Sequence, residues 1–192
     1  MRNIHFITHP EVVIDPAVPV PDWTLSPEGM RRMGLALHRP WLSRARAIFS
    51  SAERKAKDAA HLMAKHFQLS PVVMTELGEN DRSATGYLPK TEFETVADAF
   101  FARPHEAVRG WERAMDAQRR IIRAVKRVAS LAPAQGDVAI ISHGGVGALL
   151  LCHLRGEAIS RNADQPGGGG GNVFSFDAES LQLKSGWRRI EE

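Results

Sequence analysis

The sequence predicts an α/β fold, a three-layer sandwich around a mainly parallel β-sheet. Segments with strand character alternate with segments of helical periodicity along most of the chain, and this alternation is typical of a parallel sheet covered by helices. Residues 137–142, DVAIIS, are apolar on both faces, as a central parallel strand requires. Ser26-Pro27-Glu28 has the residue order of a helix start, with a capping serine, then proline, then an acid.

The remaining elements follow from apolar spacing and from breaker residues. The expected strands span residues 3–8, 47–50, 71–74, 137–142, 172–176 and 181–183. The expected helices span residues 26–39, 52–67, 91–103, 110–132 and 144–154. Loops rich in proline, glycine or polar residues are expected over 10–22, 76–89 and 166–171. We expect residues 1–192 to form a single domain, because no second core or repeat is visible.

Composition excludes several classes of protein. Of the 192 residues, 43% are hydrophobic, which is enough for a sizeable core and excludes a disordered chain. The only cysteine, Cys152, cannot form an internal disulfide. The N-terminus has no apolar signal region, and no stretch is apolar for the length of a membrane span. We therefore expect a cytoplasmic protein without a membrane partner.

A nucleic-acid binder is a further hypothesis, because the predicted helix 110–132 is rich in arginine. Its basic residues are Arg119, Arg120, Arg123, Lys126 and Arg127. The apolar positions between them indicate that these side chains form a solvated helix face. The net charge is only +3, which is small for a nucleic-acid partner. We therefore expect no nucleic-acid partner.

Polar residues gather where several predicted strands end. Ligands of parallel sheets collect at the carboxyl ends of the strands, so these residues are candidates for one shared site. The candidates are His9 after the first strand, Arg54 and Lys55 after the second, Glu76 and Glu79 after the third, and His143 and Gly144 after the fourth. Two histidines at equivalent strand ends with cations nearby indicate a functional site rather than isolated structural histidines.

Several of these segments carry a resemblance to a known family. They are FITHP, LSPEGMRRM, SSAERKAKDAA, LGENDRSATG and, most specifically, ISHGGVGALLLCHL. The chain resembles the histidine phosphatase superfamily, whose fold is phosphoglycerate-mutase-like. The resemblance covers most of the chain in the family's order. It implies hydrolysis of phosphomonoesters through a phosphohistidine intermediate, with no metal and no cofactor.

The resemblance also implies roles for individual residues. His9 lies at the position of the nucleophile, and a neutral imidazole nitrogen is suited to attack phosphorus. His143 lies at the position of the second histidine, which stabilises charge on the phosphoryl group. The acid/base residue corresponds to Glu79, whose setting Leu77-Gly78-Glu79 fits better than that of Glu76, although both stay candidates. The Gly144 amide, at a predicted helix start, is expected to contribute to anion binding.

The chain departs from the family's pattern at the phosphate pocket. The family normally has arginine before the nucleophile and glycine after it, where this chain has Thr8 and Pro10. A second family arginine corresponds to Lys55, with Arg54 beside it. Lysine supplies charge but not the bidentate geometry of a guanidinium group. We therefore expect a weakened phosphate pocket, with Thr8, Arg54, Lys55 and Gly144 as its substrate-binding residues.

Two functions follow from these observations. The first is a metal-independent phosphatase acting on a small phosphorylated compound or a phosphoprotein. The second is a catalytically impaired member of the fold that binds an anion without efficient turnover. Loss of the pocket arginine favours the second, and retention of both histidines favours the first. The short 76–89 segment leaves little room for a large lid, which argues against mutase activity.

The first function makes a geometric prediction. The strands before His9 and His143 are expected to be neighbours, so that both rings face one pocket. A shared phosphoryl group would hold their reactive nitrogens roughly 4–7 Å apart. Lys55 or Arg54 is expected to reach the same pocket, with Glu79 or Glu76 at its mouth.

Overall fold

The computed structural model of the chain describes residues 2–192, which form a six-stranded sheet with the strand order β3-β2-β4-β1-β5-β6. The strands are β1 (Asn3–Thr8), β2 (Ala45–Ser50), β3 (Val72–Val73), β4 (Asp137–Ser142), β5 (Asn172–Asp177) and β6 (Leu183–Arg189). The first four strands are mutually parallel, whereas β5 pairs antiparallel with β1 and β6. The predicted α/β architecture with a mainly parallel sheet is therefore confirmed.

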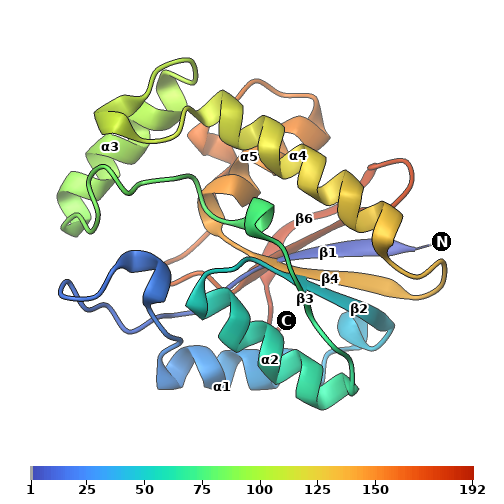
Figure 1. Cartoon of the computed structure of the whole chain (residues 1–192). Coiled ribbons are helices and arrows are strands. Elements are labelled where there is room, and N and C mark those ends of the chain that lie inside the picture. Colours follow the sequence, from blue (N-terminus) through green and yellow to red (C-terminus); the bar gives the residue numbers. More distant parts are fainter. Residues whose placement is uncertain (1) are drawn as a thin grey trace.

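Helices cover both faces of this sheet, which gives three layers (Figure 1). They are α1 (Pro27–Ala36), α2 (Arg54–Phe67), α3 (Lys90–Ala102), α4 (Ala114–Leu131) and α5 (Gly144–Arg155). Side chains of β1 alternate between the two cores: Phe6 joins the core under α4 and α5, and Ile7 joins the core under α1 and α2. Burial of both sheet faces explains the nearly continuous apolar run of β4.

Capping residues and amphipathic sequence patterns explain where the helices form. The Ser26 hydroxyl accepts a hydrogen bond from the Gly29 amide at 3.0 Å and caps α1 as predicted. In α4, Ile121 and Val125 are buried, whereas Arg123 is exposed.

Within residues 2–192, no helix has both the length and the apolar character needed to cross a membrane.

The neighbouring strands β1 and β4 determine where the two histidines lie. Thr8 is in register with Ser142, and the His9 amide donates a hydrogen bond to the Ser142 carbonyl at 3.1 Å. Since the strands are parallel and end together, His9 and His143 leave the sheet at the same edge. On the other side of β4, the Ser51 amide bonds to the Ile141 carbonyl at 2.9 Å, so the start of α2 reaches this edge too.

The two largest boundary errors concern the long helix and the last strand. The long helix begins at Ala114 and not at residue 110, because Gly110 has φ of +79° and Trp111 and Arg113 have extended ψ angles of 154° and 139°, outside the right-handed helical region. The last strand is β6, later than the predicted 181–183. Residues 178–182 instead form a turn, in which the Asp177 carboxylate accepts hydrogen bonds from the amides of Glu179 and Ser180.

Candidate active site

His9 is held in one tautomer by the backbone that follows it. Its Nδ1 lies 2.9 Å from the carbonyl oxygen of Pro10. Because a carbonyl oxygen only accepts hydrogen bonds, Nδ1 carries the proton and Nε2 of the neutral ring has a free lone pair. Burial of the ring, reinforced by neighbouring His143, lowers the pKa of His9 to about 3. His9 is therefore neutral at physiological pH, and its Nε2 can act as a nucleophile.

His143 faces His9 across the edge of the sheet. Their ring centroids are 5.2 Å apart and the ring planes meet at 67°, so the structure brings the two histidines together as the sequence predicts. The Nε2 atom of His143 lies 2.8 Å from the Ser51 hydroxyl and 3.2 Å from Oε1 of Glu53. Burial lowers the pKa of His143, while the nearby carboxylates of Glu53 and Glu79 oppose that shift.

Lys55 reaches this site and Arg54 does not. The Lys55 side chain is buried, and its Nζ donates to Oε2 of Glu53 at 2.6 Å and to the Val20 carbonyl at 2.7 Å. Arg54 is 57% exposed and pairs with Asp58 along the helix. Successive helical residues point about 100° apart, so only one of these two neighbours can face the sheet edge.

Of the two carboxylates that the sequence selects, Glu79 is the one held at the start of α5, directly after His143. Its two oxygens accept hydrogen bonds from the amides of Gly145 and Val146 at 3.0 and 2.9 Å, and Arg82 pairs with it at 2.8 Å. Burial raises the pKa of Glu79, but Arg82, His143 and the Gly145 amide together lower it below the ordinary value. Glu79 is therefore ionised at neutral pH.

The alternative carboxylate, Glu76, lies in different surroundings. Its side chain is 44% exposed and pairs with Arg127 at 3.3 Å. The structure thus favours Glu79 over Glu76 as the acid/base candidate, in agreement with the choice made from the local sequence.

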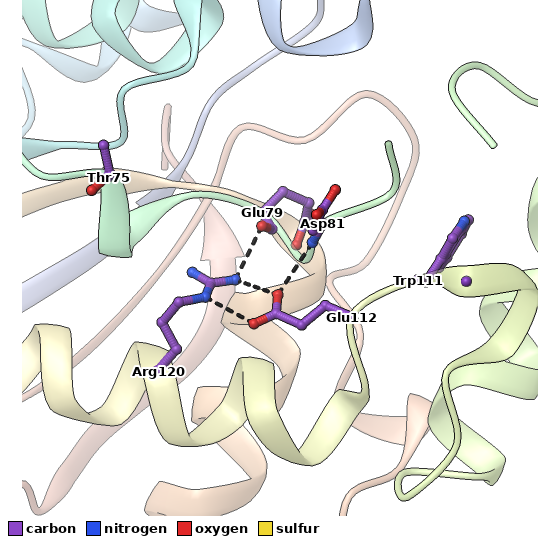
Figure 2. A pocket seen from close by; sticks show the side chains of 7 residues that line it. Thr75, Glu79, Asp81, Trp111, Glu112 and Arg120 are labelled. Atoms are coloured by element: carbon purple, nitrogen blue, oxygen red, sulfur yellow. Dashed lines mark hydrogen bonds and ion pairs between the residues drawn. The ribbon is translucent and has the colours of Figure 1, made fainter. Parts of the chain in front are cut away.

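Arg120 fixes the segment that carries Glu79. Its guanidinium group donates to the carbonyl oxygens of Glu76, Gly78 and Glu79 at 2.9, 2.9 and 3.1 Å, and forms a two-point ion pair with Glu112. Figure 2 shows this arrangement in a pocket of about 510 Å³. The sequence-based assignment of Arg120 to a solvated face is therefore wrong: α4 turns this arginine toward the loop, where it satisfies three backbone acceptors.

Thr8 and Gly144 lie against residues that flank the Gly-rich loop 166–171. The Thr8 hydroxyl donates to Oε1 of Gln165 at 2.7 Å and accepts from the Asn172 amide at 3.0 Å. A Cβ atom at Gly144 would lie 2.2 Å from Nε2 of Gln165, so a larger residue there would displace the end of the Gln165 side chain. The sequence does not point to Gln165, because this residue lies in an irregular loop without a recognisable pattern.

Two amides at the start of α5 bind a carboxylate of the same chain. The Gly145 and Val146 amides donate to Glu79, whereas the predicted contribution of the Gly144 amide to anion binding stays a prediction. A helix N-terminus favours any anion, and here a side chain of the same chain takes that position. What could bind an external anion is the cluster of His9, His143 and Lys55.

The sequence identifies the class of protein to which this fold and the paired histidines belong. A model of the histidine phosphatase superfamily (branch 1) matches residues 15–184. The chain belongs to this superfamily. The matched segment includes Lys55, Glu79 and His143, and it begins after His9. No curated protein matches the chain.

Solved structures share the fold at low sequence identity. A mycobacterial glucosyl-3-phosphoglycerate phosphatase in complex with inorganic phosphate has a TM-score of 0.80 at 20% identity, with all of both chains covered. YhfR from Bacillus stearothermophilus has a TM-score of 0.79 at 19% identity, covering 96% of this chain and 95% of its own. A phosphoserine phosphatase from Entamoeba histolytica has a TM-score of 0.76 at 12% identity, again over both whole chains. The fold is thus phosphoglycerate-mutase-like, as expected.

Proposed function

We propose that this protein hydrolyses phosphomonoesters through a phosphohistidine formed at Nε2 of His9. The observation that carries the proposal is the orientation of His9: its Nδ1 donates to the Pro10 carbonyl, and its ring lies 5.2 Å from that of His143. This leaves a neutral nitrogen with a lone pair next to a second imidazole. The arrangement suits nucleophilic attack on a phosphoryl group that both rings contact.

The reaction has two balanced steps. In the first, the Nε2 lone pair forms a bond to phosphorus while the bond to the ester oxygen breaks, and the oxygen departs with that electron pair as an alkoxide or phenoxide that takes a proton from solvent water. In the second, water attacks the phosphorus and gives a proton to Glu79, the N–P bond breaks with its electron pair returning to Nε2, and inorganic phosphate and neutral His9 are released. Lys55 supplies positive charge and the neutral His143 ring supplies an N–H hydrogen bond, and both groups stabilise the equatorial oxygens in each step.

Glu79 is suited to the second step. An ionised carboxylate accepts a proton from the attacking water, and Glu79 is held ionised by Arg82 and the start of α5. The same ionisation gives it no proton to donate to a leaving oxygen in the first step. Substrates whose alcohols are already acidic, such as aryl phosphates, are therefore expected to react more readily than alkyl phosphates.

A catalytically impaired anion-binding protein is the second candidate. It is favoured by the neutral Thr8 at the position of the family's arginine, and by the carboxylate of Glu53 in contact with Lys55 and His143. The missing arginine and the extra carboxylate both reduce the attraction of the site for a phosphate dianion. This candidate predicts binding of phosphate without turnover.

A screen over phosphate esters separates the two candidates. The set includes phosphoserine and phosphoglycerate, since similar folds are named for phosphatases of phosphoserine and glucosyl-3-phosphoglycerate, together with an aryl phosphate and a phosphopeptide. Release of phosphate by the wild-type protein but not by His9→Ala supports hydrolysis. Absence of release from every ester, with phosphate still bound, supports the impaired protein.

Hydrolysis is expected to survive removal of divalent metal ions. The proposed mechanism uses an imidazole nucleophile, the charge of Lys55 and a hydrogen bond from His143 in the roles that a metal ion would otherwise fill. The measurement is the initial rate with an aryl phosphate before and after dialysis against EDTA. Loss of activity with EDTA, followed by recovery on addition of a divalent ion, would overturn the mechanism.

A further inference from the structure

Glu53 places a carboxylate inside the candidate active site. It is the residue just before α2, but its side chain makes no capping bond to that helix. The carboxylate turns to the sheet edge instead, where Oε2 is 2.6 Å from Nζ of Lys55 and Oε1 is 3.2 Å from Nε2 of His143. The Glu79 amide also donates to Oε1 at 2.9 Å. The side chain is only 16% exposed.

These contacts are the ones that a phosphoryl group would need. An ammonium group, an imidazole and a backbone amide converge on the two carboxylate oxygens, and such charge-assisted donors bind carboxylate and phosphoryl oxygens alike. Burial opposes ionisation of Glu53, but His143 and Lys55 lower its pKa to about 2. The group is therefore a full anion throughout the pH range of an assay.

We propose that Glu53 acts as an internal anion that occupies the phosphoryl-binding position and must move away before a phosphorylated substrate can bind. The inference rests on the proposed function, because it takes His9, His143 and Lys55 as the phosphoryl site. A phosphate that contacts Lys55 and His143 would otherwise meet a like charge already bonded to both groups, and such a juxtaposition is strongly unfavourable. Glu53 thereby selects against free phosphate and favours ligands whose remaining groups provide enough binding energy to displace it.

A purely structural role for Glu53 makes the opposite prediction. If the carboxylate only holds Lys55 in place for the substrate, its removal would leave the lysine mobile and weaken anion binding. If it competes with the substrate, its removal frees Lys55 and strengthens binding. The direction of the change therefore decides between the two roles.

The test measures binding of inorganic phosphate by isothermal titration calorimetry to the wild-type protein and to Glu53→Gln. We expect the dissociation constant to fall about tenfold or more, because one like charge is lost and one cation is released. Glu53→Ala is measured as well, since glutamine could keep a hydrogen bond to Lys55. Glu106→Gln removes an exposed carboxylate that pairs with Arg103, and as the matched control it is expected to leave the dissociation constant unchanged.

A double variant and a parallel rate measurement complete the experiment. In Glu53→Gln/Lys55→Met the gain in phosphate affinity is expected to disappear, because the released cation is gone. Thermal melts establish that each variant is folded. Unchanged or weaker phosphate binding in both folded single variants would overturn the proposal. Stronger binding without turnover of any ester would keep the role of Glu53 and defeat the proposed hydrolysis, so the two failures are distinct.

Discussion

Replacement of His9 by alanine is expected to lower the rate of phosphate release by about 10³-fold or more, as removal of a covalent nucleophile does in other hydrolases. The physical reason is that no other described group at the sheet edge combines a neutral ring with a free nitrogen directed by a backbone carbonyl. His143→Ala is expected to lower the rate as well, because it removes stabilisation of the phosphoryl oxygens rather than the attacking atom. The measurement is kcat/KM with the best ester from the screen.

The matched control for His9→Ala is His105→Ala. His105 is exposed between α3 and α4, so its removal is expected to leave kcat/KM within about twofold of the wild-type value. A His9→Ala protein that keeps wild-type activity and a native melting curve would show that another residue attacks phosphorus.

Replacement of Glu79 by glutamine is expected to slow hydrolysis by about 10²–10⁴-fold, the range found for loss of a general base. Glutamine keeps the shape of the side chain but cannot accept a proton from water. The first step does not require that proton transfer, so the phosphorylated protein is expected to accumulate. Pre-steady-state measurements with an aryl phosphate would then show a burst of alcohol followed by slow turnover.

Glu76→Gln is the control for this second prediction. Glu76 belongs to the same segment, but its side chain is partly exposed and pairs with Arg127, so its charge is expected to have no effect on turnover. Glu79→Gln also weakens the charge-assisted bonds to the Gly145 and Val146 amides, at a cost of about 1–3 kcal/mol in the free energy of unfolding, and assays are run well below its melting temperature. Equal losses in both variants would contradict the assignment of Glu79.

The sequence predicts the two histidines well because their positions depend on strong local patterns. β1 and β4 are short apolar segments that end directly before His9 and His143, and parallel strands of this kind present their carboxyl ends at one edge. Because Thr8 is in register with Ser142 on the neighbouring strand, the histidines that follow them leave the sheet side by side.

Other parts of the site depend on side-chain direction and on contacts distant in sequence. The choice between Arg54 and Lys55 depends on where α2 begins, because a shift of one residue rotates the helix face by about 100°. The contacts of Glu53 with His143, and of Arg120 with the loop before Glu79, join segments about 90 and 40 residues apart, and no local periodicity reports them. Interactions of this kind become visible only in the folded chain.

In the proposed mechanism, Nε2 of His9 carries the phosphoryl group. The most direct measurement is to mix Glu79→Gln with the best ester from the screen, quench at alkaline pH, and locate the phosphoryl group by peptide mass spectrometry and by NMR correlation of phosphorus with the imidazole nitrogens. Because Nδ1 keeps its proton in a hydrogen bond to the Pro10 carbonyl, we expect a phosphoryl group on His9, bonded to Nε2. A phosphoryl group on another residue or on Nδ1, or turnover without any phosphorylated histidine, would contradict it.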